Sequence, residues 1–435
     1  MTAIEAPPAA PPRRAPLSVG GVILRLSVLA FIVRALYIVM YAKDLKLGWD
    51  ATWYTGIADS LAAGHGYSVT CPVITTCVVH QTALFPPVLP TLFAAAAKVG
   101  ISSMLGRGLL LALIGSVTVY VIGLIGYRVG GREVAIAAAV VAALNPMMII
   151  LDGALMSEGV ATLLSALLML LLIDQIRAVR TWRWFAMGTV VGLAALTRGE
   201  GPLWLIIILG PSLFFLTVVG LRSRVRGLLI AAATMVVVVS PWMIRNQYQF
   251  GTAYLGQPNL YGTLAATNCD AGYHGANIGA WTCRSSADAA FGDFGGKAAT
   301  EQVQYDEARH RAVSYATKHI SRWPVVVIAR EARTWSVLGA YHFQTGLPKI
   351  RFSVTLYDWF LFVGTLVGIG LALKRRLTIW PLLLLLLSVT LTIAVAYGNP
   401  RYLATAEPAL AVFTGIALAP LFRPRPRPQP SGRVT

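Results

Sequence analysis

The chain has 435 residues, of which 56% are hydrophobic and only 12% are charged, too few charges to cover a water-soluble globule of this size. Its formal net charge of +18 could indicate a nucleic-acid partner, but the basic residues gather in short clusters beside apolar runs. That distribution is typical of the cytoplasmic ends of membrane helices and argues against a nucleic-acid partner.

Ten apolar runs predict transmembrane helices, because such a helix crosses the ~30 Å hydrocarbon core with its own backbone hydrogen bonds satisfied. The first, 21–42, follows Arg13 and Arg14 without a small-residue cleavage site, which favours a retained signal anchor over a cleaved signal peptide. The others lie at about 107–127, 133–151, 159–177, 184–197, 202–220, 227–244, 353–373, 378–396 and 404–421.

Placing the basic clusters in the cytoplasm gives a consistent topology, in which the chain crosses the membrane an even number of times between clusters and both termini are cytoplasmic. The clusters are Arg128 and Arg132; Arg177, Arg180 and Arg183; Arg222, Arg224 and Arg226; Lys374, Arg375 and Arg376; and Arg423, Arg425 and Arg427.

Two long outer loops follow from this topology, one at about 43–106 and the other at about 245–352. In the first, the proline-rich segment 84–100 predicts a re-entrant or interfacial helix, with a full span as the alternative. In the second, a Gly/Asn-rich stretch (259–298) precedes a polar helical run at 301–319 and an amphipathic run at 323–338 that suits the membrane surface. The sequence thus predicts an all-α, polytopic membrane helix bundle over 21–421, between a disordered N-terminus (1–20) and a disordered basic tail (422–435).

The four cysteines form two local pairs, Cys71 with Cys77 and Cys269 with Cys283, one in each outer loop. An oxidising compartment would permit both as disulfides, and we predict two. A zinc site lacks CxxC spacing, and no cluster of oxygen ligands predicts another metal, although a divalent-metal requirement stays open.

Three acids stand where apolar spans meet outer loops. Asp50 is expected to begin a short amphipathic outer helix that includes Tyr54, and its alternative role is to cap that helix. Asp152 and Glu158 flank the tight turn LDGALMSEG, where Ser157 and Glu158 could instead cap the next helix.

Arginines on the same face suit a lipid phosphate, which a guanidinium binds through paired donors. The candidates are Arg198 in TRGEG, Arg245 in PWMIRN and Arg401 in GNPRYLATAEP, although snorkelling would explain any one of them. Arg34 lies inside the first span and should face the bundle interior or an aqueous groove. Together with Tyr54 and the loop residue His80, which solvation would also explain, Arg34 is a candidate substrate contact.

Six stretches resemble the polyprenyl-phosphate-sugar-dependent glycosyltransferases of the GT-C fold, a superfamily that includes the lipid A aminoarabinose transferases and the protein O-mannosyltransferases. In chain order they are WDATWYTGIADSLAAGHGYS, HQTALFPPVLPTLFA, LMSEG, LTRGEGPLW, SPWMIRNQYQFG and PRYLATAEPAL. Each stretch is a weak signal alone, but together they run from the first helix to the last and fall on the predicted outer loops.

The resemblance implies a GT-C fold and a sugar transfer from a polyprenyl-phosphate donor to a glycolipid, glycan or protein acceptor at the outer membrane surface. The family's catalytic base corresponds to Asp50, and an assisting acid on the second outer turn corresponds to Asp152 or Glu158. We expect Arg401, with Arg198 or Arg245, to hold the lipid phosphate. Ala51 follows Asp50 where some members have an Asp-Glu pair, which argues against protein O-mannosylation.

Two other readings remain at this point. A multi-span lipid or polysaccharide transporter would also need many helices and an intramembrane arginine, but no internal repeat is visible and few acids lie deep in the spans. A structural subunit of an envelope-synthesis complex with a degenerate site is the third reading. Residue usage rich in Ala, Arg and Gly suggests a bacterial plasma membrane.

Overall fold

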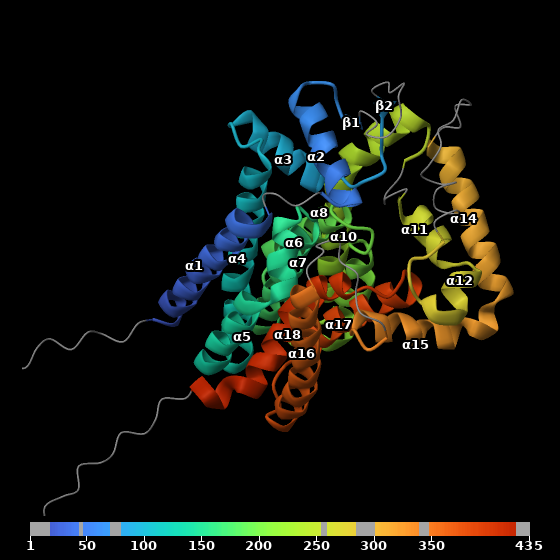
Figure 1. Ribbon diagram of the computed structural model, residues 1–435. Coiled ribbons are helices and arrows are strands. Elements are labelled where there is room, and N and C mark those ends of the chain that lie inside the picture. The colour runs from blue at the N-terminus through green and yellow to red at the C-terminus, as the bar shows by residue number, and fades with distance from the viewer. Residues whose placement is uncertain are drawn as a thin grey trace, which may run out of the picture.

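The computed structural model describes residues 18–42, 47–69, 80–253, 259–283, 301–338 and 348–422, and these are almost entirely helical. The strands described are β1 (Ser68–Val69) and β2 (His80–Gln81), which pair antiparallel. Figure 1 shows α2 (Trp49–Ala62), α3 (Val88–Lys98) and this hairpin at one end of the bundle, with both ends of the described chain away from them at the lower left. The all-α prediction is confirmed.

Six helical segments of the described chain are long and apolar enough to cross a membrane, so the protein is a multi-pass membrane protein. They are α1 (Val19–Tyr37) with its π-helical continuation Ile38–Ala42, α4 (Met104–Gly130), α7 (Glu158–Arg177), α10 (Leu221–Phe250), α16 (Pro348–Lys374) and the run from Pro400 to Phe422 that contains α18 (Leu403–Leu418).

A seventh span forms if α5 (Arg132–Leu144) and α6 (Pro146–Gly153), which are bent by 48°, are counted together. The sequence predicted one uninterrupted helix at 133–151. The break falls at Asn145, because Pro146 cannot continue the hydrogen-bond ladder and the Asn145 side chain accepts bonds from the amides of Met147 and Met148.

The remaining predicted spans are helical but shorter. They are α8 (Thr181–Ala195), the π-helix Leu205–Leu209 with α9 (Ser212–Phe215), and α17 (Trp380–Val395). Helices therefore occupy all ten predicted ranges, while the number of full crossings stays a prediction. The eleven-residue α3 lies at the expected interfacial segment and is shorter than the ~20 residues a span needs.

The core of the bundle is built around α18, every residue of which is buried from Leu403 to Ile416. It packs against α16, α5 and α7. Backbones approach closely at α16, where a Cβ on Gly368 would lie 1.9 Å from the Phe413 carbonyl oxygen. Small residues at such crossings are how membrane helices gain packing contacts, since lipid supplies no hydrophobic driving force between them.

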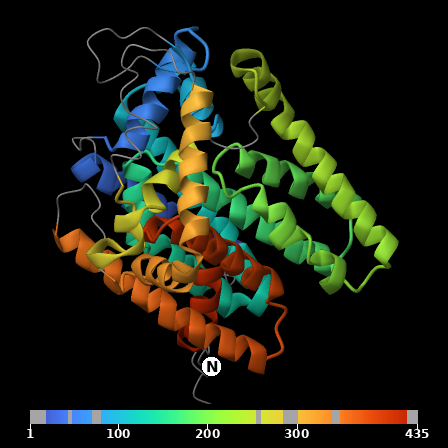
Figure 2. The same cartoon turned by 90° about the vertical axis from the view of Figure 1, so that its right-hand side faces the viewer.

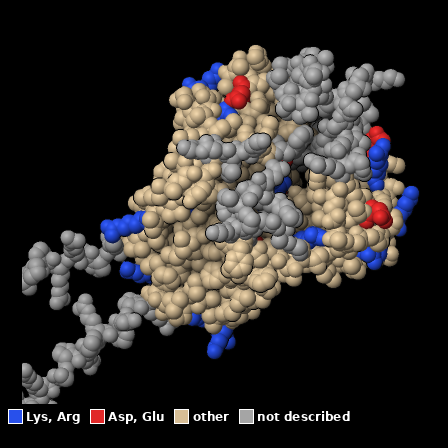
Figure 3. All heavy atoms as spheres, viewed as in Figure 1, with Lys and Arg blue, Asp and Glu red and all other residues tan. Residues whose placement is uncertain are grey.

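The outer surface of the bundle is apolar, as a lipid-facing surface must be. Large exposed apolar side chains lie on α1 (Leu24, Leu29), α10 (Val236, Val237) and α16 (Val363). Figure 2 shows α10 along one edge of the bundle, where it packs on α8. Figure 3 shows a wide uncharged surface, with charged side chains mostly at its margins.

The predicted second outer loop contributes a helical flank to the bundle (Figure 1). It consists of α11 (Asn259–Thr267), α12 (Asp270–Tyr273), the 3₁₀ turn Gly275–Asn277, α14 (Glu301–Lys318), the 3₁₀ turn Ile320–Arg322 and α15 (Trp323–Thr334). The predicted helices at 301–319 and 323–338 are therefore present. The Cys269–Cys283 disulfide is confirmed, and the predicted Cys71–Cys77 pair lies outside the described residues.

Candidate active site

Asp50 is the second residue of α2, and its carboxylate pairs with an arginine near the C-terminal end of the described chain. Gly48 is the N-cap and makes no side-chain capping bond, so the alternative role of Asp50 as N-cap does not apply. Instead, Arg401 donates from Nη1 to Asp50 Oδ2 at 2.9 Å, across 351 residues of sequence. Both side chains keep about a fifth of their surface exposed (21% and 19%), so this ion pair is open to a ligand.

Glu158 is the first residue of α7 and lies behind that pair. Its Oε1 contacts Arg198 Nη1 at 2.7 Å and Arg401 Nε at 3.5 Å, while its side chain is only 1% exposed. Ser157 precedes it as N-cap without a side-chain capping bond. Glu158 therefore links the two arginines from the buried side rather than capping its helix.

Arg198 follows α8 in the turn TRGEG and is held between two carboxylates. Its Nε donates to Glu200 Oε1 at 2.6 Å, and its guanidinium carbon lies 5.6 Å from the ring centre of Tyr402. Burial opposes its charge, but Glu200 and Glu158 together raise the pKa of Arg198 well above its usual value. Arg198 is thus a permanent cation that anchors Glu158.

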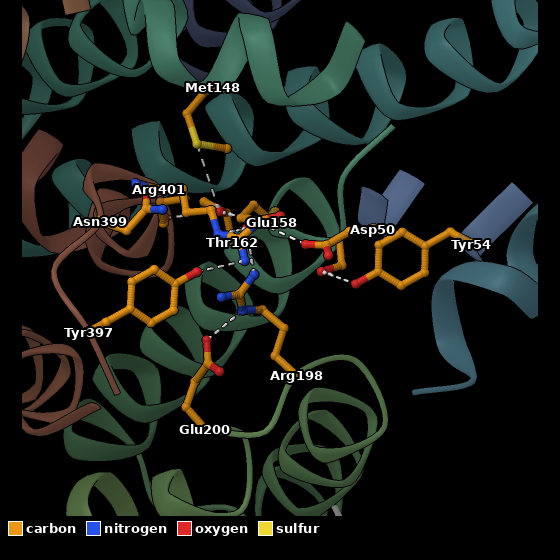
Figure 4. A network of polar contacts seen from close by, with 12 residues as sticks. Asp50, Tyr54, Met148, Glu158, Thr162, Arg198, Glu200, Tyr397, Asn399 and Arg401 are labelled. Carbon is orange, nitrogen blue, oxygen red and sulfur yellow. Dashed lines mark hydrogen bonds and ion pairs between the residues drawn. The ribbon is translucent and has the colours of Figure 1, made fainter. Parts of the chain in front are cut away.

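Arg401 is oriented by the turn that carries it. Asn399 accepts a bond from the Arg401 amide at 3.1 Å and so starts the 3₁₀ turn Pro400–Tyr402. From the guanidinium, Nη2 donates to the Tyr397 hydroxyl at 3.2 Å. Figure 4 shows Arg401 and Arg198 converging on Glu158, with Asp50 and Tyr54 on one side of this cluster and Tyr397 on the other.

Tyr54 lies one helical turn after Asp50 and is buried. Its hydroxyl donates to Ser157 Oγ at 3.2 Å, beside Glu158. Burial, and then the Asp50 and Glu158 carboxylates, raise the pKa of the phenol, so Tyr54 stays neutral at any physiological pH. It can serve this site only as a hydrogen-bonding group.

Asp152 and Arg34 form a separate pair inside the bundle. Arg34 Nε donates to Asp152 Oδ2 at 3.0 Å, with side-chain exposures of 1% and 0%. Arg34 also contacts the carbonyls of Ala142 and Ala143 at 3.4 Å, at the end of α5. Arg34 therefore faces the interior, as expected, and it is Glu158 rather than Asp152 that contacts the partner of Asp50.

Arg245 lies at the hairpin formed by β1 and β2, which belongs to the predicted first outer loop. It donates to the carbonyls of Thr82 at 2.8 Å and Tyr67 at 3.0 Å, and to Gln81 Oε1 at 2.8 Å. These contacts make Arg245 a brace for that loop, and none of them is with Arg401. His80 contributes its backbone to β2, and its side chain lies outside the described residues.

Four residues of the site have no role in the sequence-based prediction: Glu200, Tyr397, Asn399 and Tyr402. Weak signals for two of them are present. Asn399 precedes a proline, as an N-cap often does, and Glu200 stands two residues after Arg198 in a glycine-flanked turn. The position of Tyr397 on Arg401 depends on the turn between them, which no periodicity predicts.

The chemistry of the described site is that of carboxylates and guanidiniums. Across the described ranges, no three His, Cys, Asp or Glu side chains come together in a way that could hold a metal ion. The ion pairs instead run in one line from Asp50 through Arg401, Glu158 and Arg198 to Glu200. Arg401 and Asp50 are both partly exposed, so a guanidinium and a carboxylate lie side by side at the surface of the site. Such a pair suits an anionic ligand together with a hydroxyl group, either on that ligand or on a second one.

The chain has the fold of the GT-C glycosyltransferases. It is similar to the oligosaccharyltransferase AglB from Archaeoglobus fulgidus, with a TM-score of 0.53 and 15% identity to the apo form over 92% of this chain and 50% of that one. For the same enzyme with an inhibitory peptide and a dolichol-phosphate, the TM-score is 0.50 and the identity 16%, over 91% and 50%. The chain thus spans about half the length of these enzymes.

A further solved structure, ArnT from Cupriavidus metallidurans bound to undecaprenyl phosphate, matches with a TM-score of 0.42 and 16% identity, over 89% of this chain and 77% of that one. No protein-family model and no curated protein sequence matches the chain. The match to AglB therefore confirms the predicted GT-C-type helix bundle as a fold.

Proposed function

We propose that the protein is a membrane glycosyltransferase that moves a sugar from a polyprenyl-phosphate donor to the hydroxyl of an acceptor, with Asp50 as the general base. The observation that carries this proposal is the partly exposed Asp50–Arg401 pair, formed by opposite ends of the chain and backed by Glu158 and Arg198. The GT-C fold supports it, and the similar AglB enzyme has been solved with a dolichol-phosphate.

The proposed reaction needs little more than a base and an anion site. The acceptor oxygen attacks the anomeric carbon, the bond from that carbon to the phosphate oxygen breaks, and the hydroxyl proton passes to Asp50. The departing polyprenyl phosphate takes the bonding electrons, so paired N–H donors from Arg401 stabilise it. A single displacement of this kind inverts the anomeric centre.

The geometry assigns different tasks to the two acids near Arg401. Asp50 is partly exposed and contacts one arginine among the described residues, so a substrate phosphate can take over Nη1 and leave Oδ2 to accept a proton. Glu158 is buried between two guanidiniums and is a poor base, because both favour its ionised form. We assign Glu158 to positioning Arg401, and Arg198 to holding Glu158.

The end of the bundle that carries the site supports an extracytoplasmic location. Glu158 begins α7 and Arg177 ends it, about 28 Å away at 1.5 Å per residue, so the basic cluster at 177–183 lies at the opposite membrane surface. At that surface Arg128 pairs with Asp174 at 2.7 Å. Basic clusters mark the cytoplasmic side, so in this proposal Asp50 lies at the extracytoplasmic surface. We infer that the membrane is a bacterial plasma membrane.

The test is release of polyprenyl phosphate from a polyprenyl-phosphate sugar by the full-length protein in lipid nanodiscs. We expect turnover by the wild type and a loss of about 10²- to 10⁴-fold in Asp50→Asn, the range for removal of a general base. Asp306→Asn, an exposed acid on α14, is the matched control and should retain activity. Full activity in Asp50→Asn would remove Asp50 from the base role.

A lipid transporter is the second candidate, because two polar pairs are buried inside the bundle. They are Arg34 with Asp152, and Asn145, which donates to Glu407 Oε2 at 2.7 Å. A transporter would move the lipid-linked sugar across a proteoliposome membrane and leave its phosphate–sugar bond intact. Transport of the intact donor, without any polyprenyl phosphate released, would favour this function over sugar transfer.

A further inference from the structure

The turn that carries Arg401 is held by residues of the second outer loop, far from it in sequence. Between α17 and the 3₁₀ turn Pro400–Tyr402, the backbone turns sharply at residues 396–399. The Gly398 amide donates to the Gly279 carbonyl at 2.8 Å, and the Asn399 amide donates to Thr334 Oγ1 at 3.1 Å. Both acceptors belong to the helical flank rather than to the bundle.

Arg330 of α15 fixes the other side of the same turn. Its Nη1 donates to the Ala394 carbonyl at 2.6 Å and to the Val395 carbonyl at 3.0 Å, at the last residues of α17. These carbonyls have no partner within their own helix, and the negative end of the helix dipole favours a cation there. The packing of α15 on α17, visible in Figure 1, places this guanidinium over the start of the turn.

The contact between the flank and the turn is too close for a side chain. A Cβ on Gly398 would lie 2.4 Å from the Arg330 carbonyl oxygen and 2.5 Å from Arg333 Cβ. Only glycine allows this approach, so the turn and α15 are in backbone contact. A shift of α15 therefore moves the turn.

Arg330 is buried (3% exposed), and no carboxylate of the described chain pairs with it. Its third partner is Asn268 Oδ1 at 3.3 Å, which also accepts from the Tyr273 hydroxyl at 2.8 Å. The partners of Nη1 and Nη2 are all carbonyl and amide oxygens, and Nε has no hydrogen-bond partner among the described residues. A buried cation held in this way has a fixed position, because each lost contact would leave more of its charge desolvated.

The Cys269–Cys283 disulfide closes the segment that supplies these outer contacts. Asn268 directly precedes the bridge, and Gly279 lies within it. The Gly279 amide bonds to the Gly272 carbonyl at 2.9 Å, and the Cys283 amide to the Ala266 carbonyl at 3.0 Å, so the bridged segment is folded on itself. The bridge therefore supports both contacts from the outer side.

We infer that Arg330 and Thr334 of α15, together with the disulfide-closed segment 269–283, form a clamp on the turn at 396–399 that positions Arg401 for the donor phosphate. In this assignment Arg330 is a positioning residue. It contacts the carbonyls of Ala394 and Val395, which directly precede the turn, and does not contact the substrate. The inference rests on the proposed function for the identity of the ligand, while the clamp itself rests on the hydrogen bonds that link Arg330, Thr334 and Gly279 to the turn.

Two measurements on the full-length protein test the clamp. Arg330→Met removes the hydrogen-bond donors and the charge at similar side-chain length, whereas Arg330→Lys keeps the charge. Thr334→Val removes the acceptor for the Asn399 amide, whereas Thr334→Ser keeps it. Amide hydrogen exchange across 396–402 should quicken up to about tenfold in Arg330→Met and Thr334→Val, the effect of losing one hydrogen bond. It should stay near wild type in Thr334→Ser, and in Arg311→Gln, which removes an exposed charge on α14.

In the same variants, we expect kcat/KM for the lipid-linked donor to fall about 10- to 100-fold, with weaker binding of polyprenyl phosphate and partial recovery in Arg330→Lys. Unchanged exchange would overturn the clamp. Faster exchange with unchanged phosphate binding would overturn its role in positioning Arg401. If the wild type turned over no lipid-linked donor, the proposed function would fail, whereas exchange would still decide the clamp.

Discussion

Arg401 holds two carboxylates at once, through different nitrogen atoms. Nη1 contacts Asp50 and Nε lies 3.5 Å from Glu158. A planar guanidinium can keep the buried contact while it offers its outer edge to a phosphate, and the point charge of a lysine cannot do both. In the proposed mechanism, this division allows the base and the phosphate site to be neighbours without remaining permanently neutralised by each other.

Substitution of Arg401 tests that division. We expect Arg401→Lys to lower kcat/KM for the donor about tenfold to a hundredfold and Arg401→Gln to lower it further, because paired charge-assisted bonds to the phosphate are lost. Steady-state kinetics with a polyprenyl-phosphate sugar is the measurement, and Arg311→Lys on α14 is the control. Equal donor kinetics in Arg401→Gln and the wild type would place the phosphate elsewhere.

Glu158 should act on stability as well as on activity. Glu158→Gln leaves Arg198 and Arg401 without the charge that neutralises them in a buried position, and breaking a buried pair in this way costs about 3–5 kcal/mol. We expect a clear fall in the midpoint of thermal unfolding in detergent. Asp50→Asn, at the partly exposed end of the network, should change it little. A wild-type midpoint in Glu158→Gln would contradict the buried bridge.

Among the elements, α15 joins the flank to the bundle and contains a carboxyl in an unfavourable position. Burial raises the pKa of Glu331 to about 7 from an ordinary value of 4.5, and its Oε1 has no hydrogen-bond partner among the described residues. The folded state therefore binds the Glu331 proton more tightly than the unfolded state does. Deprotonation destabilises the fold as pH rises from about 4.5 to 7 and by a constant amount above that.

Glu331→Gln removes this penalty, so it should stabilise the protein at pH 8 and have little effect near pH 4.5. The measurement is the difference between the unfolding midpoints of variant and wild type across that range. The difference should grow with pH and level off above pH 7, in line with the raised pKa. A difference independent of pH would mean that the carboxyl does not titrate in this range.

The elements themselves were largely predictable from the sequence. Apolar runs gave the helices, and helical spacing after Asp50 gave α2. The break at Asn145 was missed because the run 133–151 is apolar apart from Glu133 and Asn145, and only the Asn-Pro pair marks the bend. The helices α8, α17 and the segment 205–215 are shorter than a simple crossing, so the number of full crossings stays a prediction.

At the scale of the whole molecule, the bundle brings α2 and the turn before the last helix together. The sequence could nominate Asp50, Glu158, Arg198 and Arg401 as separate residues at span ends, but their mutual contacts depend on the packing of α18 against α7. The same limit explains Arg34 and Asp152. Each was a candidate for the site, and nothing local shows that they pair with each other.

The most direct test of the account is an experimental structure of the protein with polyprenyl phosphate bound. We predict that the phosphate contacts Arg401, opens the Arg401–Asp50 pair and lies beside the Asp50 carboxylate, while Glu158 keeps its contact with Arg198. A phosphate bound at the Arg245 brace or elsewhere, with the Asp50–Arg401 pair still closed, would contradict the proposed active site.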